Sequence, residues 1–297
     1  MNGCNRRAFA TCAAATLVTP AFAQRSAEPI VTRAIPSSGE RLPSVGLGTA
    51  RVFDSDDAAT LRAATEVLRA LVDGGGRLVD TASSYGDAEQ VLGRVLAATG
   101  LRERTFIATK LEAADTSELD RSLKRLGVAR VDLLQLHNVR DPRQSLAQFR
   151  DWKAQGRCRY IGITSTYHGD FAALEAVLGR EKPDFVQVDY SLDNHDAQQR
   201  TLSRAADVGA GVLTALPFGR GRLFRAVRGR AIPDWAQGFA ASWAQFFLKY
   251  LIADDRVTAV IPGTADARHM TDNLGAMRGA LPDAGERQRM VAYIESL

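Results

Sequence analysis

The chain has 297 residues, of which 45% are hydrophobic and 24% charged, so it is long enough to bury a single large core. Its 38 lysines and arginines exceed its 34 acidic residues by only four, and this slight, unclustered excess argues against a nucleic-acid-binding surface. Only one of its three cysteines, Cys158, lies beyond the first 23 residues, so no internal disulfide is expected in the mature protein.

Residues 1–23 are predicted to be an export signal and not part of the fold. They contain the pair Arg6 and Arg7, an uncharged run rich in alanine, and "AFA" at the end, which is typical of a signal-peptidase site. "NRRAFA" favours the twin-arginine route over an ordinary secretory signal, and no cysteine stands at the cleavage point for a lipid anchor. The apolar run is too short to span a bilayer. We expect residues 24–297 to be exported to the periplasm, with the export machinery as a partner.

Beyond residue 42, short β-branched segments alternate with amphipathic helical patterns. The predicted strands are Val45–Leu47, Leu78–Thr81, Phe106–Thr109, Val131–Leu136, Tyr160–Thr164, Phe185–Asp189, Gly211–Leu216 and Ala259–Pro262. The predicted helices are Ala58–Asp73, Glu89–Ala98, Thr116–Leu126, Ser145–Gln155, Phe171–Leu178, Asp196–Ala206, Asp234–Ile252 and Ala267–Met277. This alternation indicates βαβ units and a parallel sheet, and eight repeats in about 250 residues are typical of a (β/α)8 TIM barrel.

The alternative α/β fold is an open doubly wound sheet. That fold needs a glycine-rich turn leading from its first strand into a helix, and "GLGTA" has neither the spacing nor the helix. We therefore predict one barrel domain over residues 24–297. A long insert, Phe218–Pro233, follows the seventh strand, and an extra helix, Ala284–Leu297, ends the chain.

Four residues with useful chemistry fall where predicted strands end. Asp80 ends the second strand, Lys110 follows the third, His137 follows the fourth, and Tyr85 lies in the loop after Asp80. The carboxyl ends of barrel strands and the loops behind them line one common mouth. We therefore expect these four side chains to converge.

The chemistry of this set suits the reduction of a carbonyl group. Hydride addition leaves an alkoxide that needs a proton, and a phenol such as Tyr85 is a poor donor near neutral pH unless a cation lowers its pKa. Lys110 is the expected cation, Asp80 would hold it in place, and His137 would orient the carbonyl oxygen. Taken singly, each residue also fits a structural role such as a helix cap or a surface ion pair, but the set of matched roles favours catalysis.

From Leu42 to Ala280 the chain resembles the aldo-keto reductase superfamily. The family's catalytic tetrad has the pattern of Asp and Tyr in "DTASSYG", Lys in "FIATK" and His in "LLQLHN". "SLKRLGVARVDLLQLHN" is similar to the family's fourth βα unit. The resemblance implies a barrel oxidoreductase that uses a nicotinamide cofactor, with Asp80, Tyr85, Lys110 and His137 as the catalytic residues.

The resemblance also implies residues around the nicotinamide. Gln187 in "FVQVDYS" matches the glutamine that binds the carboxamide, and Thr164 and Ser165 stand where the family usually has Ser-Asn. Many members stack a tyrosine or an arginine on the nicotinamide ring. Ala215 or Leu216 takes that position here, so the stacking contact is missing.

The rest of the cofactor is assigned to two later segments. "PFGRGR" is similar to the loop that wraps the pyrophosphate, and the implied contacts are Pro217, Phe218, Gly219, Arg220, Gly221 and Arg222. "IPGTADARHMTDNLGAM" resembles the adenine-side motif, with Gly263, Thr264, Arg268, His269 and Asn273 as the implied contacts. Gly-Thr replaces the Lys-Ser of many members, so the lysine on the 2′-phosphate is missing. NADP(H) is favoured and NAD(H) remains open.

The remaining expectations concern the substrate, metals and other classes of function. Phe53, in the loop after the first strand, is predicted to line the substrate pocket for a small carbonyl compound. Four histidines and one mature cysteine give no metal-ligand spacing, so no metal site is predicted. Two alternatives are a cofactor-binding sensor or subunit with little turnover, and a lyase or isomerase using Tyr85 and His137 without redox. The sequence does not identify the substrate, the route of cofactor re-reduction after export, or the oligomeric state.

Overall fold

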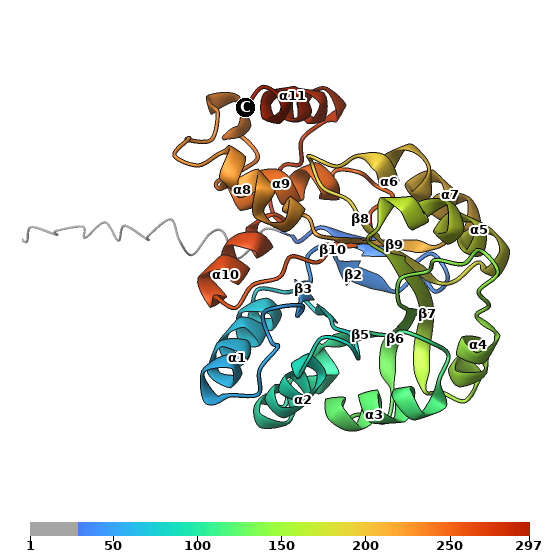
Figure 1. Cartoon of the computed structure of the whole chain (residues 1–297). Helices are drawn as coiled ribbons and strands as arrows, with labels where there is room; N and C mark the ends of the chain where they lie inside the picture. The colour runs from blue at the N-terminus through green and yellow to red at the C-terminus, as the bar shows by residue number, and fades with distance from the viewer. Residues whose placement is uncertain (1–28) are drawn as a thin grey trace, which may run out of the picture.

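The computed structural model describes residues 29–297, so the predicted export signal and its cleavage point lie outside the described residues. The described chain forms one curled parallel sheet with helices packed around its outer face (Figure 1). The single-domain (β/α)8 prediction is confirmed. No helix among residues 29–297 is long and apolar enough to cross a membrane.

Eight parallel strands make the barrel. They are β3 Leu47–Gly48, β4 Leu78–Asp80, β5 Phe106–Leu111, β6 Val131–Leu136, β7 Cys158–Ser165, β8 Phe185–Asp189, β9 Gly211–Ala215 and β10 Ala259–Val260. Each pairs with the next strand along the chain. Two isolated parallel bridges, Val45 with Val260 and Gly48 with Gly263, join the first segment to the last and close the sheet.

The helices follow the predicted order: α1 and α3 have the predicted bounds, the ends of the others are shifted, and the short α8 in the insert was not predicted. They are α1 Ala58–Asp73, α2 Ala88–Thr99, α3 Thr116–Leu126, α4 Ala147–Ala154, α5 Phe171–Glu181, α6 Asp196–Gln199, α7 Thr201–Val208, α8 Arg222–Ala226, α9 Trp243–Ile252, α10 Ala267–Gly275 and α11 Ala284–Glu295. The predicted helix at 196–206 is divided at Arg200, whose φ of −134° is not helical. The helix predicted from Asp234 begins only at Trp243, because Ser242 caps that end through the backbone N–H of Gln245.

Local sequence signals determine where α3, the helix after β5, begins and ends. Asp115 accepts a hydrogen bond from the Ser117 N–H and begins α3, and Gly127, at φ 65°, ends it in the left-handed conformation. The buried face of α3 carries Leu119, Leu123 and Leu126 at helical spacing. These signals set the two ends of α3 and the face that it buries between β5 and β6 in the chain.

A period of two along each strand decides which side chains face the barrel interior. In β5, Phe106 and Ala108 belong to the interior cluster of apolar side chains, whereas Ile107 and Leu111 belong to the larger cluster between the sheet and the helices. Lys110 continues the inward series of Phe106 and Ala108. The charged Lys110 side chain enters the barrel because Lys110 is the third inward-facing residue of β5.

An N-terminal hairpin that the sequence pattern did not predict closes the other end of the barrel. β1 Thr32–Ala34 pairs antiparallel with β2 Arg41–Pro43. Ile35 and Leu42 are fully buried in the interior cluster, together with Phe106 and Phe185 from the starts of their strands. Apolar side chains fill the barrel interior at this end, and the polar side chains of the cavity gather at the carboxyl ends of the strands.

Candidate active site

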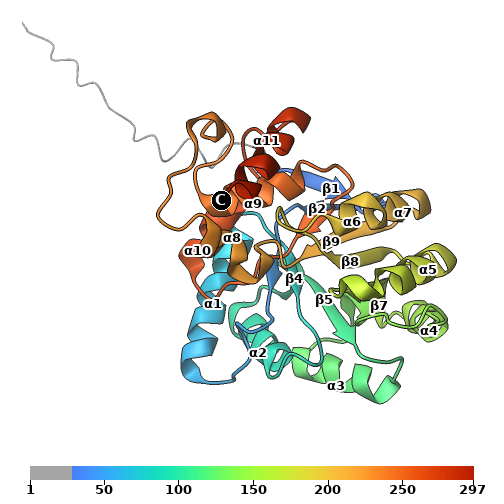
Figure 2. The same ribbon diagram turned by 45° about the horizontal axis from the view of Figure 1, so that its top comes forward.

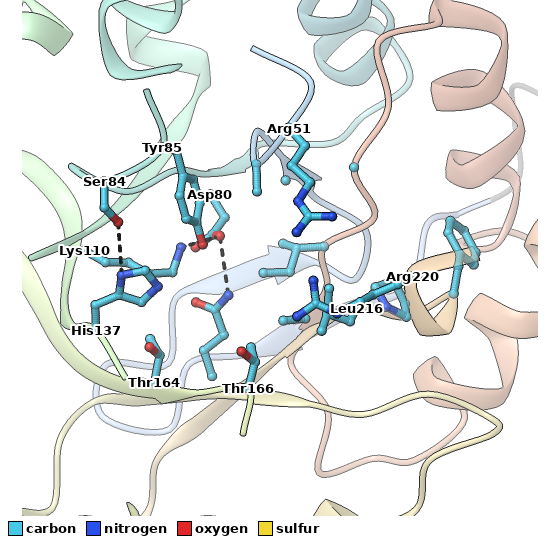
Figure 3. A pocket seen from close by; sticks show the side chains of 18 of the residues that line it. Arg51, Asp80, Ser84, Tyr85, Lys110, His137, Thr164, Thr166, Leu216 and Arg220 are labelled. Atoms are coloured by element: carbon cyan, nitrogen blue, oxygen red, sulfur yellow. Dashed lines mark hydrogen bonds and ion pairs between the residues drawn. The ribbon is translucent and has the colours of Figure 1, made fainter. Parts of the chain in front are cut away.

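The carboxyl ends of the strands surround a cavity of about 810 Å³, lined by residues at those strand ends and in several of the loops that follow them. Figure 2 shows the ribbon turned so that its top comes forward, with helices on the outer side of the strands. All four residues of the predicted catalytic set line this cavity, and Figure 3 shows them at its wall. The expected convergence of Asp80, Tyr85, Lys110 and His137 is therefore observed.

The innermost feature of the cavity is a buried ion pair. The Lys110 Nζ lies 2.6 Å from Asp80 Oδ2 and also donates to the Thr81 carbonyl oxygen at 2.7 Å. Lys110 is 1% exposed and Asp80 3% exposed. Burial disfavours the ammonium, but the Asp80 carboxylate and the Tyr85 phenol beside it outweigh burial and raise the pKa of Lys110 above its ordinary value. Lys110 is therefore a fixed positive charge at the cavity floor.

Two glutamines complete the partners of Asp80. Gln135, from β6, donates to Asp80 Oδ1 at 3.4 Å and to Gln187 Oε1 at 3.0 Å. Gln187, from β8, donates to Asp80 Oδ2 at 3.4 Å. Gln135 was not predicted, although it lies two residues before His137 on the same strand face. Its buried Oε1 has no hydrogen-bond partner among the described residues.

Tyr85 covers this ion pair from the cavity side. Lys110 Nζ lies 5.0 Å from the centroid of the Tyr85 ring. A tight turn holds the ring, since the Tyr85 N–H donates to the Ala82 carbonyl and the Tyr85 carbonyl accepts from the Ala88 N–H at the start of α2. Gly86, at φ 53°, lets this loop pass close to the Asp54 carbonyl, where a Cβ would stand 3.1 Å away.

His137 stands beside Tyr85 with an acid behind it. The two rings meet edge to face, with centroids 5.7 Å apart. His137 Nδ1 lies 2.5 Å from Glu112 Oε1, and Ser84 Oγ donates to the same oxygen at 2.8 Å. Burial and the Lys110 ammonium lower the pKa of His137, against the opposing effect of Glu112. Glu112 was not predicted, because it follows Lys110 by two residues and reads as a loop acid.

Seven of the predicted cofactor residues line the same cavity. They are Thr164, Gln187, Pro217, Phe218, Arg220, Gly221 and Gly263. Arg220 has a left-handed backbone, with φ 54°, and no ion pair is found for it among the described residues. Leu216, also at positive φ, lies on the wall beside it (Figure 3).

The other predicted cofactor residues do not line the cavity. Ser165 is fully buried, and its Oγ accepts a hydrogen bond from the Tyr167 N–H. Gly219 is buried in the turn below Arg220, where a Cβ would stand 2.7 Å from the Asp193 carboxylate. Arg222 pairs with that same carboxylate at 2.9 Å.

The adenine-side residues lie farther along the chain, in and before α10. Thr264 accepts a hydrogen bond from the Asp266 N–H. Arg268 is exposed and pairs with Asp266 at 2.7 Å. His269 is exposed on α10, and Asn273 is buried in it.

The prediction that Phe53 lines the substrate pocket is wrong. Its side chain is 0% exposed and packs in the cluster between sheet and helices, because the Phe53 N–H donates to the Thr49 carbonyl and turns the loop inward. Arg51, with φ 63°, faces the cavity from that loop (Figure 3). Tyr167 and Phe224 supply the exposed aromatic surface at the rim. No sequence pattern distinguished these residues from other loop positions.

No group of three or more histidine, cysteine, aspartate or glutamate side chains that could hold a metal occurs within residues 29–297. Cys158 lies buried at the start of β7, far along the strand from the cavity, and burial raises the pKa of its thiol to about 12.

A family model for the aldo/keto reductase family matches residues 44–289, and the chain belongs to this family. It is 28% identical over 255 residues to the methylglyoxal reductase YeaE of Escherichia coli, covering 82% of this chain and 88% of that protein. It is also 28% identical over 282 residues to a 6-dehydroglucose reductase of Novosphingobium aromaticivorans, covering 84% and 91%. An aldo-keto reductase from Klebsiella pneumoniae, solved in complex with NADPH, has the same fold with a TM-score of 0.75 and 24% identity, covering 89% and 96% of the two chains.

Replacing one member of the buried ion pair is expected to destabilise the fold strongly. Lys110→Met leaves the Asp80 carboxylate buried without its cation, which costs about 3 to 5 kcal/mol of unfolding free energy. The double variant with Asp80→Asn should lose less than the two single losses together, because it removes both charges. Denaturant unfolding at pH 7 measures these differences, and additive losses would contradict the coupling.

The pH dependence of this stabilisation follows from the sign of the pKa shift. Because folding raises the pKa of Lys110 above its ordinary value of 10.5, the contribution of the ion pair to stability is complete below that pH. It is lost as the pH rises through the higher folded value. The stability difference between wild type and double variant, measured by denaturant unfolding, should therefore stay constant from pH 7 to about pH 10 and shrink above it. A difference that shrank on acidification within that range would contradict the assignment.

Proposed function

We propose that the protein reduces an aldehyde or ketone to an alcohol with NADPH, using Tyr85 as the general acid. The observation that carries the proposal is the position of the Tyr85 phenol on the cavity wall, above the buried Lys110 ammonium and beside His137. A proton donor, a cation that stabilises its conjugate base and a second polar group thus surround one point in the cavity.

The residues present fit a dinucleotide. The cavity runs from the Gln187 amide at its floor to Arg220, Gly221 and Gly263 at its rim. Within residues 29–297 the Arg220 guanidinium has no ion pair, and a guanidinium suits a phosphate oxygen. Gly221, at φ 81°, leaves the backbone open beside it. When bound, the reduced nicotinamide supplies the hydride.

The side chains of the cavity then carry out the protonation. Hydride addition to the carbonyl carbon places the electron pair of the C=O bond on oxygen, and the Tyr85 hydroxyl gives that oxygen its proton. The phenolate left behind is stabilised by the Lys110 ammonium, which Asp80 holds in place. The proton returns to Tyr85 from solvent through the open mouth of the cavity. No metal is required in this scheme.

A small polar carbonyl compound is the substrate class that we favour. The named relatives reduce methylglyoxal and 6-dehydroglucose, according to their names. Arg51, Asp54, Ser84 and Thr166 put charged and hydroxyl groups on the cavity wall, which supports a substrate of that polarity. The NADPH in the solved Klebsiella pneumoniae structure supports NADP(H) over NAD(H).

We further propose that the chain is exported by the twin-arginine route, on the basis of the arginine pair in "NRRAFA", the uncharged run after it and the "AFA" cleavage pattern. A protein exported in the folded state can carry a bound cofactor with it and recycle it between two substrates. Accumulation of the uncleaved chain in the cytoplasm of its native cells would contradict this proposal.

The Tyr85→Phe variant tests the catalytic assignment. Losing only the hydroxyl should lower kcat for reduction of methylglyoxal roughly 10²- to 10⁴-fold, with NADPH binding unchanged, because the phenol acts on the substrate oxygen and not on the nucleotide. Steady-state turnover and fluorescence titration with NADPH and NADH measure the two effects. Retention of wild-type kcat would contradict the role of Tyr85. Nucleotide binding without turnover of any aldehyde by the wild type would favour the sensor alternative.

Two arginine variants test how the nucleotide is held. Arg220→Ala should weaken NADPH and NADH equally, by about tenfold, because both carry the pyrophosphate. Arg268→Ala should weaken only NADPH, because the 2′-phosphate is the group in which the two differ. The measurement is the dissociation constant of each nucleotide by fluorescence titration. If neither substitution changed the dissociation constant of either nucleotide, this arrangement would be contradicted.

A further inference from the structure

The contact between His137 and Glu112 bears on which ring nitrogen of His137 carries the proton. The strand register pairs Leu111 of β5 with Leu136 of β6, so the next residues, Glu112 and His137, stand side by side. The backbone N–H of His137 donates to the Leu111 carbonyl at 2.8 Å, which holds the two backbones together. This register brings the half-exposed Glu112 side chain within reach of the ring, and Glu112 Oε1 lies 2.5 Å from His137 Nδ1.

The partners of Glu112 Oε1 decide the direction of that hydrogen bond. A carboxylate only accepts. The other group near Nδ1 is Ser84 Oγ, at 3.4 Å, and its proton goes to the same Glu112 oxygen at 2.8 Å. His137 must then supply the proton, so Nδ1 carries it. In the neutral imidazole the other nitrogen, Nε2, is left with a lone pair.

We propose that Glu112 is a positioning residue that fixes the Nδ1–H tautomer of His137, so that His137 can donate to a carbonyl oxygen only as the imidazolium ion. The inference rests on the proposed carbonyl reduction. In the neutral state the lone pairs of Nε2 and of the carbonyl oxygen face each other and repel. In the imidazolium state Nε2–H donates to that oxygen, and the Glu112 carboxylate balances the positive charge.

The charged and titratable groups around His137 determine when the imidazolium forms. Lys110 and Glu112 face it from β5 and its end, Asp80 from β4, and Tyr85 from the loop after β4. Burial and the Lys110 ammonium lower the pKa of His137, and the two carboxylates raise it. Since the lowering effects prevail, His137 is mostly neutral at neutral pH. Reduction is therefore expected to speed up on acidification.

The Glu112→Ala variant tests whether the carboxylate sets both the tautomer of His137 and the pH dependence of reduction. Without the carboxylate, Nδ1 need not hold the proton, and the neutral Nε2–H tautomer can donate to the carbonyl. In the wild type, kcat/KM for methylglyoxal reduction should fall about tenfold per pH unit above the pKa of His137. In Glu112→Ala that fall should flatten to less than about twofold per unit over the same range. Glu66→Ala, which removes an exposed acid of α1 away from the cavity, is the matched control and should keep the wild-type profile.

The tautomer itself is read without turnover by ¹⁵N–¹H correlation spectra of the histidine rings, with His137 assigned by its loss in His137→Gln. The expected result is Nδ1–H in the wild type and mainly Nε2–H in Glu112→Ala. Glu112→Asp keeps the carboxylate and should restore part of the Nδ1–H population. Nε2–H in the wild type, or the same tautomer and pH profile in Glu112→Ala, would overturn the proposal.

The failure of the proposed function looks different from the failure of this inference. A wild-type protein that turns over no carbonyl, but whose spectra show Nδ1–H at His137 and its loss in Glu112→Ala, would refute the reductase and leave the role of Glu112 in place. Turnover of a carbonyl by the wild type, with the same His137 tautomer in Glu112→Ala, would support the reductase and refute the role of Glu112.

Discussion

The site depends on one buried ion pair. Lys110 and Asp80 are both nearly inaccessible, and each would be costly to bury alone. Asp80, with the Thr81 carbonyl, holds the Lys110 ammonium at the carboxyl end of the barrel, and Gln135 and Gln187 are further partners of Asp80. The phenol of Tyr85 lies over this charge. If the barrel interior were apolar up to the carboxyl ends of the strands, the Tyr85 phenol would have no cation beneath it.

The barrel also separates the parts of the molecule that give stability from those that give chemistry. The hairpin of β1 and β2 fills the amino end of the barrel with Ile35 and Leu42, among the aromatic rings of Phe106 and Phe185. The same inward period that buries these rings leads to Lys110 and Gln187 two or four residues later along each strand. Stability and function are therefore carried by successive positions of the same strand faces. Loops after the strands add Tyr85, Arg51 and Arg220 to the cavity wall.

Much of this arrangement was predictable from the sequence, because period and strand order are local properties. Asp80, Lys110 and His137 were found as polar residues directly at the ends of apolar segments. The failures have physical reasons. Phe53 was judged by its loop alone, whereas a backbone hydrogen bond to Thr49 turns it into the core. The hairpin strands are three residues long and carry little pattern. Glu112 acquires its role only through the pairing of β5 with β6, which brings it to His137.

The central claim is that the cavity transfers a hydride to a carbonyl carbon, and isotope transfer tests it most directly. The purified protein would be given methylglyoxal and NADPH carrying deuterium at one of the two C4 positions of the nicotinamide, and the alcohol analysed by mass spectrometry and NMR. The account predicts one deuterium on the former carbonyl carbon from one of the two labelled cofactors and none from the other. Unlabelled alcohol from both cofactors, or product formed without nicotinamide oxidation, would contradict it.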